Sequence, residues 1–225
     1  MIFQLFANFF DIIDLVKLYG RKEMLFKILE LCLTAFIAYL IGSIPTGYLI
    51  VKAKTGQDIR TVGSGSTGAT NVKRVLGKKW FFIVMILDAV KGALPVFLAK
   101  LFIAAGVSLG IAPVIAAVAV IIGHSKSLFL EFKGGKSVAS GVGTIIALNW
   151  LAGIIIAVVW GVITYFTKYV SVGSIIALLA SPFIMYFLNA PIAYVAYCAL
   201  GAIYIVYLHR ENIKRLMQGN ENKVR

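Results

Sequence analysis

The chain has 225 residues, of which 60% are apolar and 14% charged, with 22 Lys and Arg against 9 Asp and Glu. Soluble proteins carry about a quarter charged residues, whereas here the apolar residues form blocks of roughly 20, the length of a membrane span. This composition excludes a soluble globular domain and predicts an all-α, polytopic integral membrane protein. The formal charge of +13 favours anionic lipid over nucleic acid as the partner.

The first 23 residues alternate polar and large apolar side chains. Their polar members recur at helical spacing: Gln4, Asn8, Asp11 and Asp14. Two carboxylates near the centre of a bilayer would be costly, so residues 1–23 are predicted to form an amphipathic interfacial helix instead of a span. We expect residues 24–225 to form one transmembrane domain.

Gly, Pro, Asn and charged residues divide the remaining chain into seven predicted spans. They are residues 28–51, 80–104, 110–125, 138–149, 150–167, 172–189 and 190–208. The fourth is shorter than the roughly 20 residues that a crossing needs. It therefore fits a half-helix that is paired with the next span around Asn149 and Trp150.

The distribution of basic residues predicts the orientation. Basic residues gather in 52–79, in 126–136, at Lys168 and in the tail, whereas the turns between the other span ends carry none. Seven spans with the N-terminus outside place all these clusters, and the C-terminus, in the cytoplasm. This arrangement places the cluster of Lys17, Arg21, Lys22 and Lys27 on the outer side of the membrane, where neighbouring acidic residues lower its net charge.

Three polar segments meet at this predicted cytoplasmic surface. They are GQDIRTVGSGSTGATNVKR (56–74), FKGGKSVASGVG (132–143) and HRENIKRL (209–216). Backbone N–H groups freed by glycine, hydroxyls and cations together favour an anion, most commonly a phosphate. Close helix packing through small residues is the alternative for the first segment, but it leaves these polar side chains unexplained: Ser64, Ser66, Thr70, Asn71 and Arg74.

Individual positions within these segments leave alternatives open. Ala69 stands where a nucleotide-binding loop would carry Lys, which excludes a Walker motif. Lys136 directly precedes a predicted helix, so its charge and the helix N-terminus would both attract an anion at the same place. The alternative is a basic turn that only sets the membrane topology. His209 is consistent with a residue of the anion site or with a histidine at the membrane interface. Ser171 and Ser174 are consistent with positions in the wall of the pocket or with helix caps.

Two further polar positions lie inside the apolar blocks. Asp88 and Lys91 are three residues apart on one helix face, which predicts an ion pair. His124 has no carboxylate near it in sequence and fits a structural role. No His, Cys or carboxylate pair has metal-ligand spacing, so neither a metal nor another cofactor is expected.

Seven sequence segments together resemble a known family. They are GSIPTG at 42, DIRTVGSGSTGATNV at 58 with Arg74 after it, LDAVKG at 87, GH at 123, FKGGKSVA at 132, YVSVGS at 169 and HRENIKRLMQG at 209. In this order they resemble the bacterial acyl-phosphate:glycerol-3-phosphate acyltransferase family, the PlsY family, from about residue 24 onward. Departures occur at Ser66, at Lys126 and Ser127, and at Ser137.

The resemblance implies a seven-helix enzyme of the bacterial inner membrane with its site facing the cytoplasm. It would move an acyl group from acyl phosphate to the 1-hydroxyl of glycerol 3-phosphate, giving lysophosphatidate and phosphate, and we expect it to act as a monomer. The expected catalytic residues are Ser64, Arg74, Lys136, His209 and Asn212. The expected substrate-binding residues are Gly63, Gly65, Ser66, Thr70, Asn71, Gly134, Gly135, Ser171 and Ser174.

The residues also indicate a mechanism. The chain lacks a His-x-x-x-x-Asp motif, which would supply a general base. The fifth residue after His124 is Phe129, and the fifth after His209 is Lys214. An acyl phosphate is already activated, and its departing phosphate can take the proton of the attacking hydroxyl. We therefore expect direct transfer without an acyl-enzyme. A small transporter of an organic phosphate is the alternative, and it would place polar groups near mid-membrane and show internal repeats.

Overall fold

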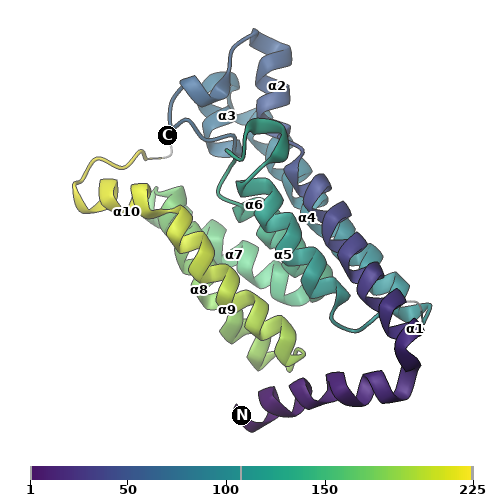
Figure 1. Ribbon diagram of the computed structural model, residues 1–225. Coiled ribbons are helices and arrows are strands. Elements are labelled where there is room, and N and C mark those ends of the chain that lie inside the picture. Colours follow the sequence, from purple (N-terminus) through teal and green to yellow (C-terminus); the bar gives the residue numbers. More distant parts are fainter. Residues whose placement is uncertain (1, 107, 224–225) are drawn as a thin grey trace.

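The computed structural model describes residues 2–106 and 108–223, and all regular elements in these ranges are helices (Figure 1). The helices are α1 (Ile2–Ser43), α2 (Thr46–Thr55), α3 (Ala69–Leu76), α4 (Lys78–Ala104), α5 (Ala112–Ser125), α6 (Val138–Leu148), α7 (Trp150–Thr167), α8 (Val170–Phe187), α9 (Ile192–Leu208) and α10 (Arg210–Met217). Two short 3-10 helices, η1 (Ile59–Thr61) and η2 (Leu128–Leu130), lie in the loops.

Five helical segments of the described chain are long and apolar enough to cross a membrane. They are Lys22–Thr55, Lys78–Ala104, Ala112–Leu130, Trp150–Thr167 and Val170–Phe187. The helices α9 and α10, bent by 58° against each other, make a sixth when taken together, and α6 is a shorter apolar helix. The predicted all-α membrane fold is confirmed, while seven crossings and the orientation of the termini stay predictions.

The predicted span 28–51 is not one continuous helix. The helix α1 ends at Ser43 and α2 begins at Thr46, with Ile44 and Pro45 between them. Proline lacks the N–H that a helix interior needs and disfavours helical geometry in the residue before it, so the helix breaks here. This break brings α2 and the loop after it to the end of the bundle where α3 and α10 lie, here called the motif end (Figure 1).

The N-terminal part of α1 turns away from the bundle. Gly20 has φ 70° and ψ 160°, outside helical geometry, and the chain changes direction there. Figure 1 shows the first part of α1 lying crosswise at the end opposite to the motif end. The amphipathic character of residues 1–23 rests on side chains outside the described ones, so the interfacial role and the boundary after residue 23 stay predictions.

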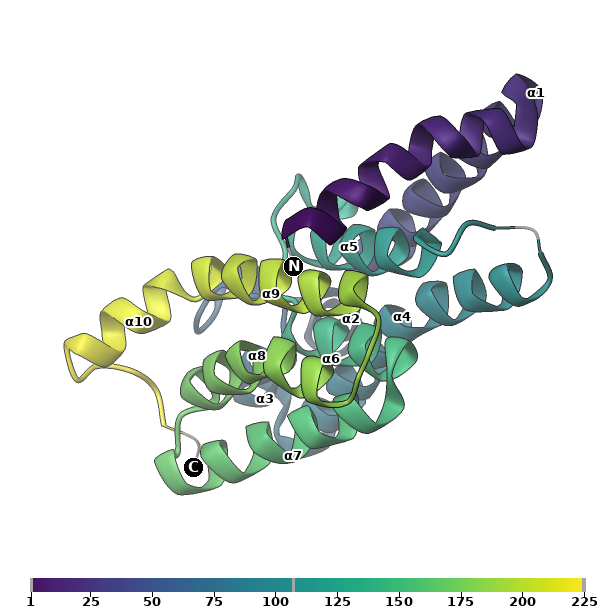
Figure 2. The same cartoon turned by 90° about the horizontal axis from the view of Figure 1, so that it is seen from below.

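Two glycines hold α4 and α6 in close contact. A Cβ atom on Gly92 would lie 2.2 Å from the Ser140 carbonyl oxygen, and one on Gly143 would lie 2.0 Å from that of Ala89. Small residues at helix contacts allow the backbones to approach in this way. Along the rest of the bundle, α1 packs on α5, and α7, α8 and α9 lie side by side on the other flank (Figure 2). The short helix α6 is therefore fixed in position by α4, next to α7.

Candidate functional site

The three polar segments converge on one cavity of about 330 Å3 at the motif end. It is lined by every predicted site residue except four glycines, namely by Ser64, Ser66, Thr70, Asn71, Arg74, Lys136, Ser171, Ser174, His209 and Asn212. The exceptions are Gly63, Gly65, Gly134 and Gly135. The geometric part of the expectation, a shared hollow for the three segments, therefore agrees with the structure, and the roles of the residues stay predictions.

Asn71 holds the first polar segment in shape. Its side-chain nitrogen donates to the carbonyl oxygens of Ile59, Val62 and Ser66 at 3.2, 2.9 and 2.9 Å. Its side-chain oxygen accepts the N–H of Ser64 at 3.0 Å. These bonds occupy the carboxamide, so Asn71 acts on the loop backbone, while the side chains of Ser64, Thr70 and Arg74 remain in the cavity wall.

Gly63 permits this arrangement. It has φ 60°, a left-handed conformation that favours glycine, and an added Cβ would lie 2.3 Å from the Asn71 side-chain oxygen. Gly65 also has a positive φ, of 67°. Both glycines shape the loop and lie outside the cavity lining. The sequence analysis had expected them to contact the substrate.

Lys136 and the C-terminal segment share a hydrogen-bond network. The Lys136 ammonium donates to the side-chain oxygen of Asn212, and the Asn212 nitrogen donates to Glu221 Oε1 at 2.6 Å. Glu221 also accepts from Ser171 Oγ at 2.9 Å and pairs with Arg215 Nε at 2.7 Å. The carboxylate thus receives three donors of the kind that would surround a phosphate oxygen.

The network shifts two ionisation equilibria. Burial, with a smaller effect of the Arg215 charge, lowers the pKa of the Lys136 ammonium to about 8. Burial would raise the pKa of the Glu221 carboxyl, but the hydrogen bonds from Asn212, Arg215 and Ser171 outweigh it and lower that pKa. Lys136 is therefore a cation near neutral pH that loses its charge at moderately alkaline pH.

His209 and Ser174 have partners that orient them. His209 Nδ1 lies 2.8 Å from the carbonyl oxygen of Ile205, which can only accept, so Nδ1 carries a hydrogen. In the neutral ring Nε2 is then the acceptor nitrogen. Ser174 Oγ donates to the Val170 carbonyl at 2.8 Å and accepts from Trp160 Nε1 at 3.2 Å.

A Ser, a His and an Asp also lie together between α4, α5 and α6, where Asp88 and His124 line the cavity. His124 Nδ1 is 3.0 Å from Ser140 Oγ and 3.8 Å from Asp88 Oδ1. A catalytic triad needs its Ser and Asp on opposite ring nitrogens, whereas here both face Nδ1. Ser140 is fully buried and lies outside the cavity lining. This cluster is therefore not arranged as a nucleophile with its base.

Asp88 also forms the predicted ion pair. Lys91 Nζ lies 2.8 Å from Asp88 Oδ1, which confirms the pair expected from their spacing. The position of His124 next to this carboxylate was not expected, because the two residues lie on different helices and are far apart in the chain.

The sequence reasoning missed several cavity residues. Arg215 could have been found, since it follows Asn212 by three positions and so shares a helix face with it. Glu221 has no such signal, because it lies in the tail after α10. Gly134 and Gly135 were expected to offer N–H groups to an anion, but the Gly135 N–H donates to the His124 carbonyl at 3.1 Å.

The cavity continues from its polar end into an apolar wall. Its apolar lining includes Phe81, Met85, Ile86 and Ala89 of α4, Val138, Ala139 and Val142 of α6, and Ala157 and Trp160 of α7. A second hollow continues along the same three helices, lined among others by Ala93, Phe97, Ile146 and Trp150. We call these two hollows the furrow, with α4 and α7 as its edges and α6, which packs against both, as its floor. Such a site can hold an anionic head group and an apolar tail at once.

Comparison with known proteins agrees with this geometry. The family model described as glycerol-3-phosphate acyltransferase matches residues 32–219. A glycerol-3-phosphate acyltransferase from Nostoc sp. is 41% identical over 210 residues, which cover 87% of this chain and 93% of the relative. The enzyme of that name from Endomicrobium trichonymphae is 44% identical over 202 residues, covering 90% of this chain and 98% of the relative.

Two solved structures share the architecture. One is the crystal structure of PlsY (YgiH), an integral membrane glycerol 3-phosphate acyltransferase, in its glycerol 3-phosphate form, with a TM-score of 0.81 and 34% identity. The other is the lysophosphatidic acid form, with a TM-score of 0.79 and 32% identity. Each covers 87% of this chain and 96% of the solved one, so the likeness extends over nearly the whole fold.

Proposed function

The chain belongs to the glycerol-3-phosphate acyltransferase family, and we propose that it moves a fatty acyl group from acyl phosphate to the 1-hydroxyl of glycerol 3-phosphate. The products are lysophosphatidate and inorganic phosphate. The observation that carries the proposal is a single cavity whose lining joins cations and hydroxyls to apolar side chains of α4, α6 and α7.

The cations suit two phosphate groups held together. Arg74, Lys136 and Arg215 all line the cavity and bring three positive charges near one place, and Glu221, which pairs with Arg215, offsets one of them. The two substrates repel each other as anions, so several cations are needed to bring them into contact. Arg74 can grip a phosphate through two N–H groups, whereas Lys136 acts as a point charge. The hydroxyls of Ser64 and Thr70 also line the cavity and can donate to phosphate oxygens.

The reaction needs no covalent intermediate. A bond forms between the glycerol 1-oxygen and the acyl carbon, the bond from that carbon to the phosphate oxygen breaks, and the hydroxyl proton passes to the departing phosphate. The protein contributes orientation and charge stabilisation. The acceptor nitrogen Nε2 of His209 is available to orient the attacking hydroxyl, because Nδ1 is already committed to Ile205.

The acyl tail fits the furrow. From Met85 to Phe97 the helix α4 rises by about 18 Å, at 1.5 Å per residue, which suits most of a long acyl chain. Met85 and Ala89 lie on one edge, Val142 on the floor and Ala157 on the other edge. An apolar tail that enters this furrow leaves its acyl phosphate head among the cations of the motif end.

The donor and the reaction can be tested together. Purified protein is incubated with glycerol 3-phosphate and either hexadecanoyl phosphate or hexadecanoyl thioester, and lysophosphatidate is measured. We expect product from the acyl phosphate and none from the thioester. Product from the thioester alone would overturn the donor, and no product from either would overturn the activity. Substrate flux into liposomes without chemistry would then support the transporter alternative.

An acyl-enzyme on Ser140 would contradict direct transfer. We expect Ser140→Ala to retain kcat, because the proposed reaction does not use this hydroxyl as a nucleophile, while KM rises because Ser140 Oγ contacts the positioning residue His124. A hydroxylamine-sensitive acyl label on wild-type protein that disappears in Ser140→Ala would show a covalent intermediate.

The proposed location is the bacterial inner membrane, with the cavity on the cytoplasmic side and one chain sufficient for activity. Cys32 and Cys198 are first replaced by Ala, and single cysteines are then placed at the exposed positions Lys133 and Ala105. An impermeant thiol reagent should label whole spheroplasts at Ala105→Cys and not at Lys133→Cys. The reverse pattern would overturn the orientation.

A further inference from the structure

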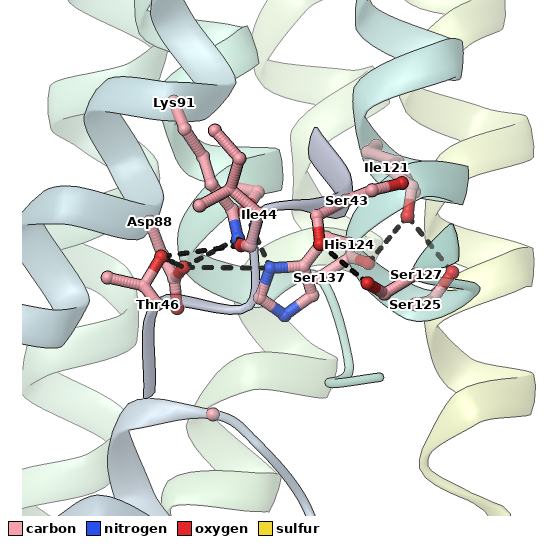
Figure 3. A network of polar contacts seen from close by, with 12 residues as sticks. Ser43, Ile44, Thr46, Asp88, Lys91, Ile121, His124, Ser125, Ser127 and Ser137 are labelled. Carbon is pink, nitrogen blue, oxygen red and sulfur yellow. Dashed lines mark hydrogen bonds and ion pairs between the residues drawn. The ribbon is translucent and has the colours of Figure 1, made fainter. Parts of the chain in front are cut away.

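A buried polar network lies among the membrane helices next to the cavity (Figure 3). The side chains of Asp88, Lys91 and His124 belong to residues that are 2%, 8% and 7% exposed. Ionisable groups inside a membrane protein are costly and generally serve a function. The proposed reaction assigns no task to any of the three.

One part of the network holds the break between α1 and α2. Lys91 Nζ donates to the carbonyl oxygen of Ile44 at 2.7 Å. Thr46 Oγ1 donates to Asp88 Oδ1 at 3.0 Å. The ion pair of Asp88 and Lys91 is therefore tied to both sides of Pro45, and this fixes the Asp88 carboxylate in front of the His124 ring (Figure 3).

The other part of the network fixes the His124 ring and brings the turn that precedes Lys136 into contact with it. Ser140 Oγ lies within hydrogen-bond distance of Nδ1, at 3.0 Å, and Asp88 Oδ1 lies farther from the same atom, at 3.8 Å. Nε2 faces Gly135, where an added Cβ would be 2.2 Å away. A Cβ on Gly134 would lie 2.1 Å from the His124 carbonyl oxygen. The Gly135 N–H donates to that same oxygen. Lys136 is the next residue in the chain after this contact.

We propose that His124, held by Asp88 and Ser140, is a positioning residue that sets where the Lys136 ammonium stands in the cavity. The two glycines before Lys136 let the turn rest on the imidazole ring and the backbone of His124. This inference rests on the proposed role of Lys136 as a cation for substrate phosphate. Removing the ring would leave the turn unsupported on one side and displace the ammonium from the anion.

The first test compares single and double variants at the contact. His124→Ala removes the ring, and Gly135→Ala places a methyl group where the ring stands. A misplacement of about 1 Å can cost about 100-fold, so we expect each single variant to raise KM for glycerol 3-phosphate or acyl phosphate by about 10- to 100-fold. The double variant should recover part of this loss, because its methyl group fills space that the ring has left.

The second test asks whether His124 acts through Lys136. The affinity for inorganic phosphate is measured by isothermal titration for His124→Ala, Lys136→Gln and the double variant. If His124 works through Lys136, the effects are not additive, and His124→Ala changes little once Lys136 is replaced. Full additivity, or loss of kcat with KM and phosphate affinity unchanged, would overturn the proposal.

A matched variant separates positioning from stability. Met185 is fully buried in α8 and lies outside the cavity lining. Met185→Ala should lower the melting temperature, as His124→Ala does, but leave both KM values and the phosphate affinity unchanged. His124→Asn, which keeps a polar group toward Ser140 and Asp88, should recover part of the affinity.

The outcomes distinguish this inference from the proposed function. If the wild type makes lysophosphatidate, Lys136→Gln loses activity and His124→Ala behaves as wild type, the inference is wrong and the function stands. If the wild type makes no product, the function fails by itself.

Discussion

Lys136 and Asn212 are 76 positions apart in the chain, and the Lys136 ammonium donates directly to the Asn212 side-chain oxygen. The Asn212 nitrogen is committed to Glu221, which fixes the orientation of the carboxamide. Because both ends of the carboxamide are engaged, the ammonium stands at a defined place in the cavity, between the turn before α6 and the C-terminal segment.

The protonation of Lys136 should be visible in the pH dependence of KM. Its pKa is about 8, lowered mainly by burial and also by Arg215 and Arg74, while Glu221 and Glu211 act in the opposite direction. Below this pH the ammonium is charged and holds phosphate, and above it the charge is lost. We expect KM for glycerol 3-phosphate to rise above pH 8, by at most about tenfold per pH unit.

Lys136→Arg is the control for this titration. Arginine stays charged throughout the range, so the rise of KM between pH 8 and 9.5 should vanish, although KM at pH 7 is higher because the shape of the cation has changed. A rise of the same size in the Arg variant would mean that another group titrates.

Glu221→Gln should change stability in a pH-dependent way. The pKa of Glu221 is lowered in the folded protein, so its carboxylate stabilises the fold above the unfolded pKa, and this contribution disappears as pH falls through the folded value. We expect a lower melting temperature for the variant at pH 7 and a difference that narrows below about pH 4.5. Glu211→Gln, at an exposed position of α10, is the control for loss of a carboxylate.

Asn71→Ala should loosen the first polar segment. The variant removes the side-chain donor from three loop carbonyl groups, of which those of Ile59 and Val62 keep a backbone N–H partner, and it frees the Ser64 N–H. Each lost bond to a buried group costs about 1 to 3 kcal/mol. We expect kcat/KM to fall by at least about tenfold and amide exchange in residues 59–68 to accelerate. Asn220→Ala, at an exposed position in the tail, is the matched control, and unchanged exchange in Asn71→Ala would contradict the prediction.

Ala157→Trp should narrow the furrow and shorten the preferred acyl chain. Ala157 lines the cavity, whereas its neighbour Val158 does not and is exposed. The expected result is a fall of kcat/KM for hexadecanoyl phosphate by about tenfold or more, with decanoyl phosphate affected less. Val158→Trp adds the same ring outside the furrow and should leave the ratio of the two substrates unchanged. Equal losses for both chain lengths in Ala157→Trp would place the tail elsewhere.

The membrane fold followed from the sequence because each apolar block is long and the charges lie between the blocks. The break at Pro45 inside the predicted span 28–51 was not foreseen, because the effect of a proline on a helix is local and the residues on both sides are apolar. The short helix α6 agreed with the length argument, and its pairing with α7 at Asn149 is present as a cap, with the Asn149 side chain accepting from the Ala152 N–H at 3.1 Å.

The site was predicted less completely, because its parts meet only through tertiary packing. Residues in motifs with glycine, hydroxyl and cation could be named, and most of them line the cavity. Glycine patterns do not distinguish an anion-binding N–H from a close contact, and Gly134 and Gly135 have the close contact with His124. Glu221 and the neighbourhood of Asp88 and His124 depend on contacts between distant segments, which local spacing does not record.

The exposure of Ile86 has a kinetic consequence under the proposed function. Ile86 lines the cavity and is 57% exposed, so the proposed acyl chain enters past this side chain without leaving the bilayer. The polar end receives its other substrate from water. The two reactants therefore arrive from different phases, and the rate depends on the mole fraction of donor among the surrounding lipids, whereas the acceptor enters the rate law through its molar concentration.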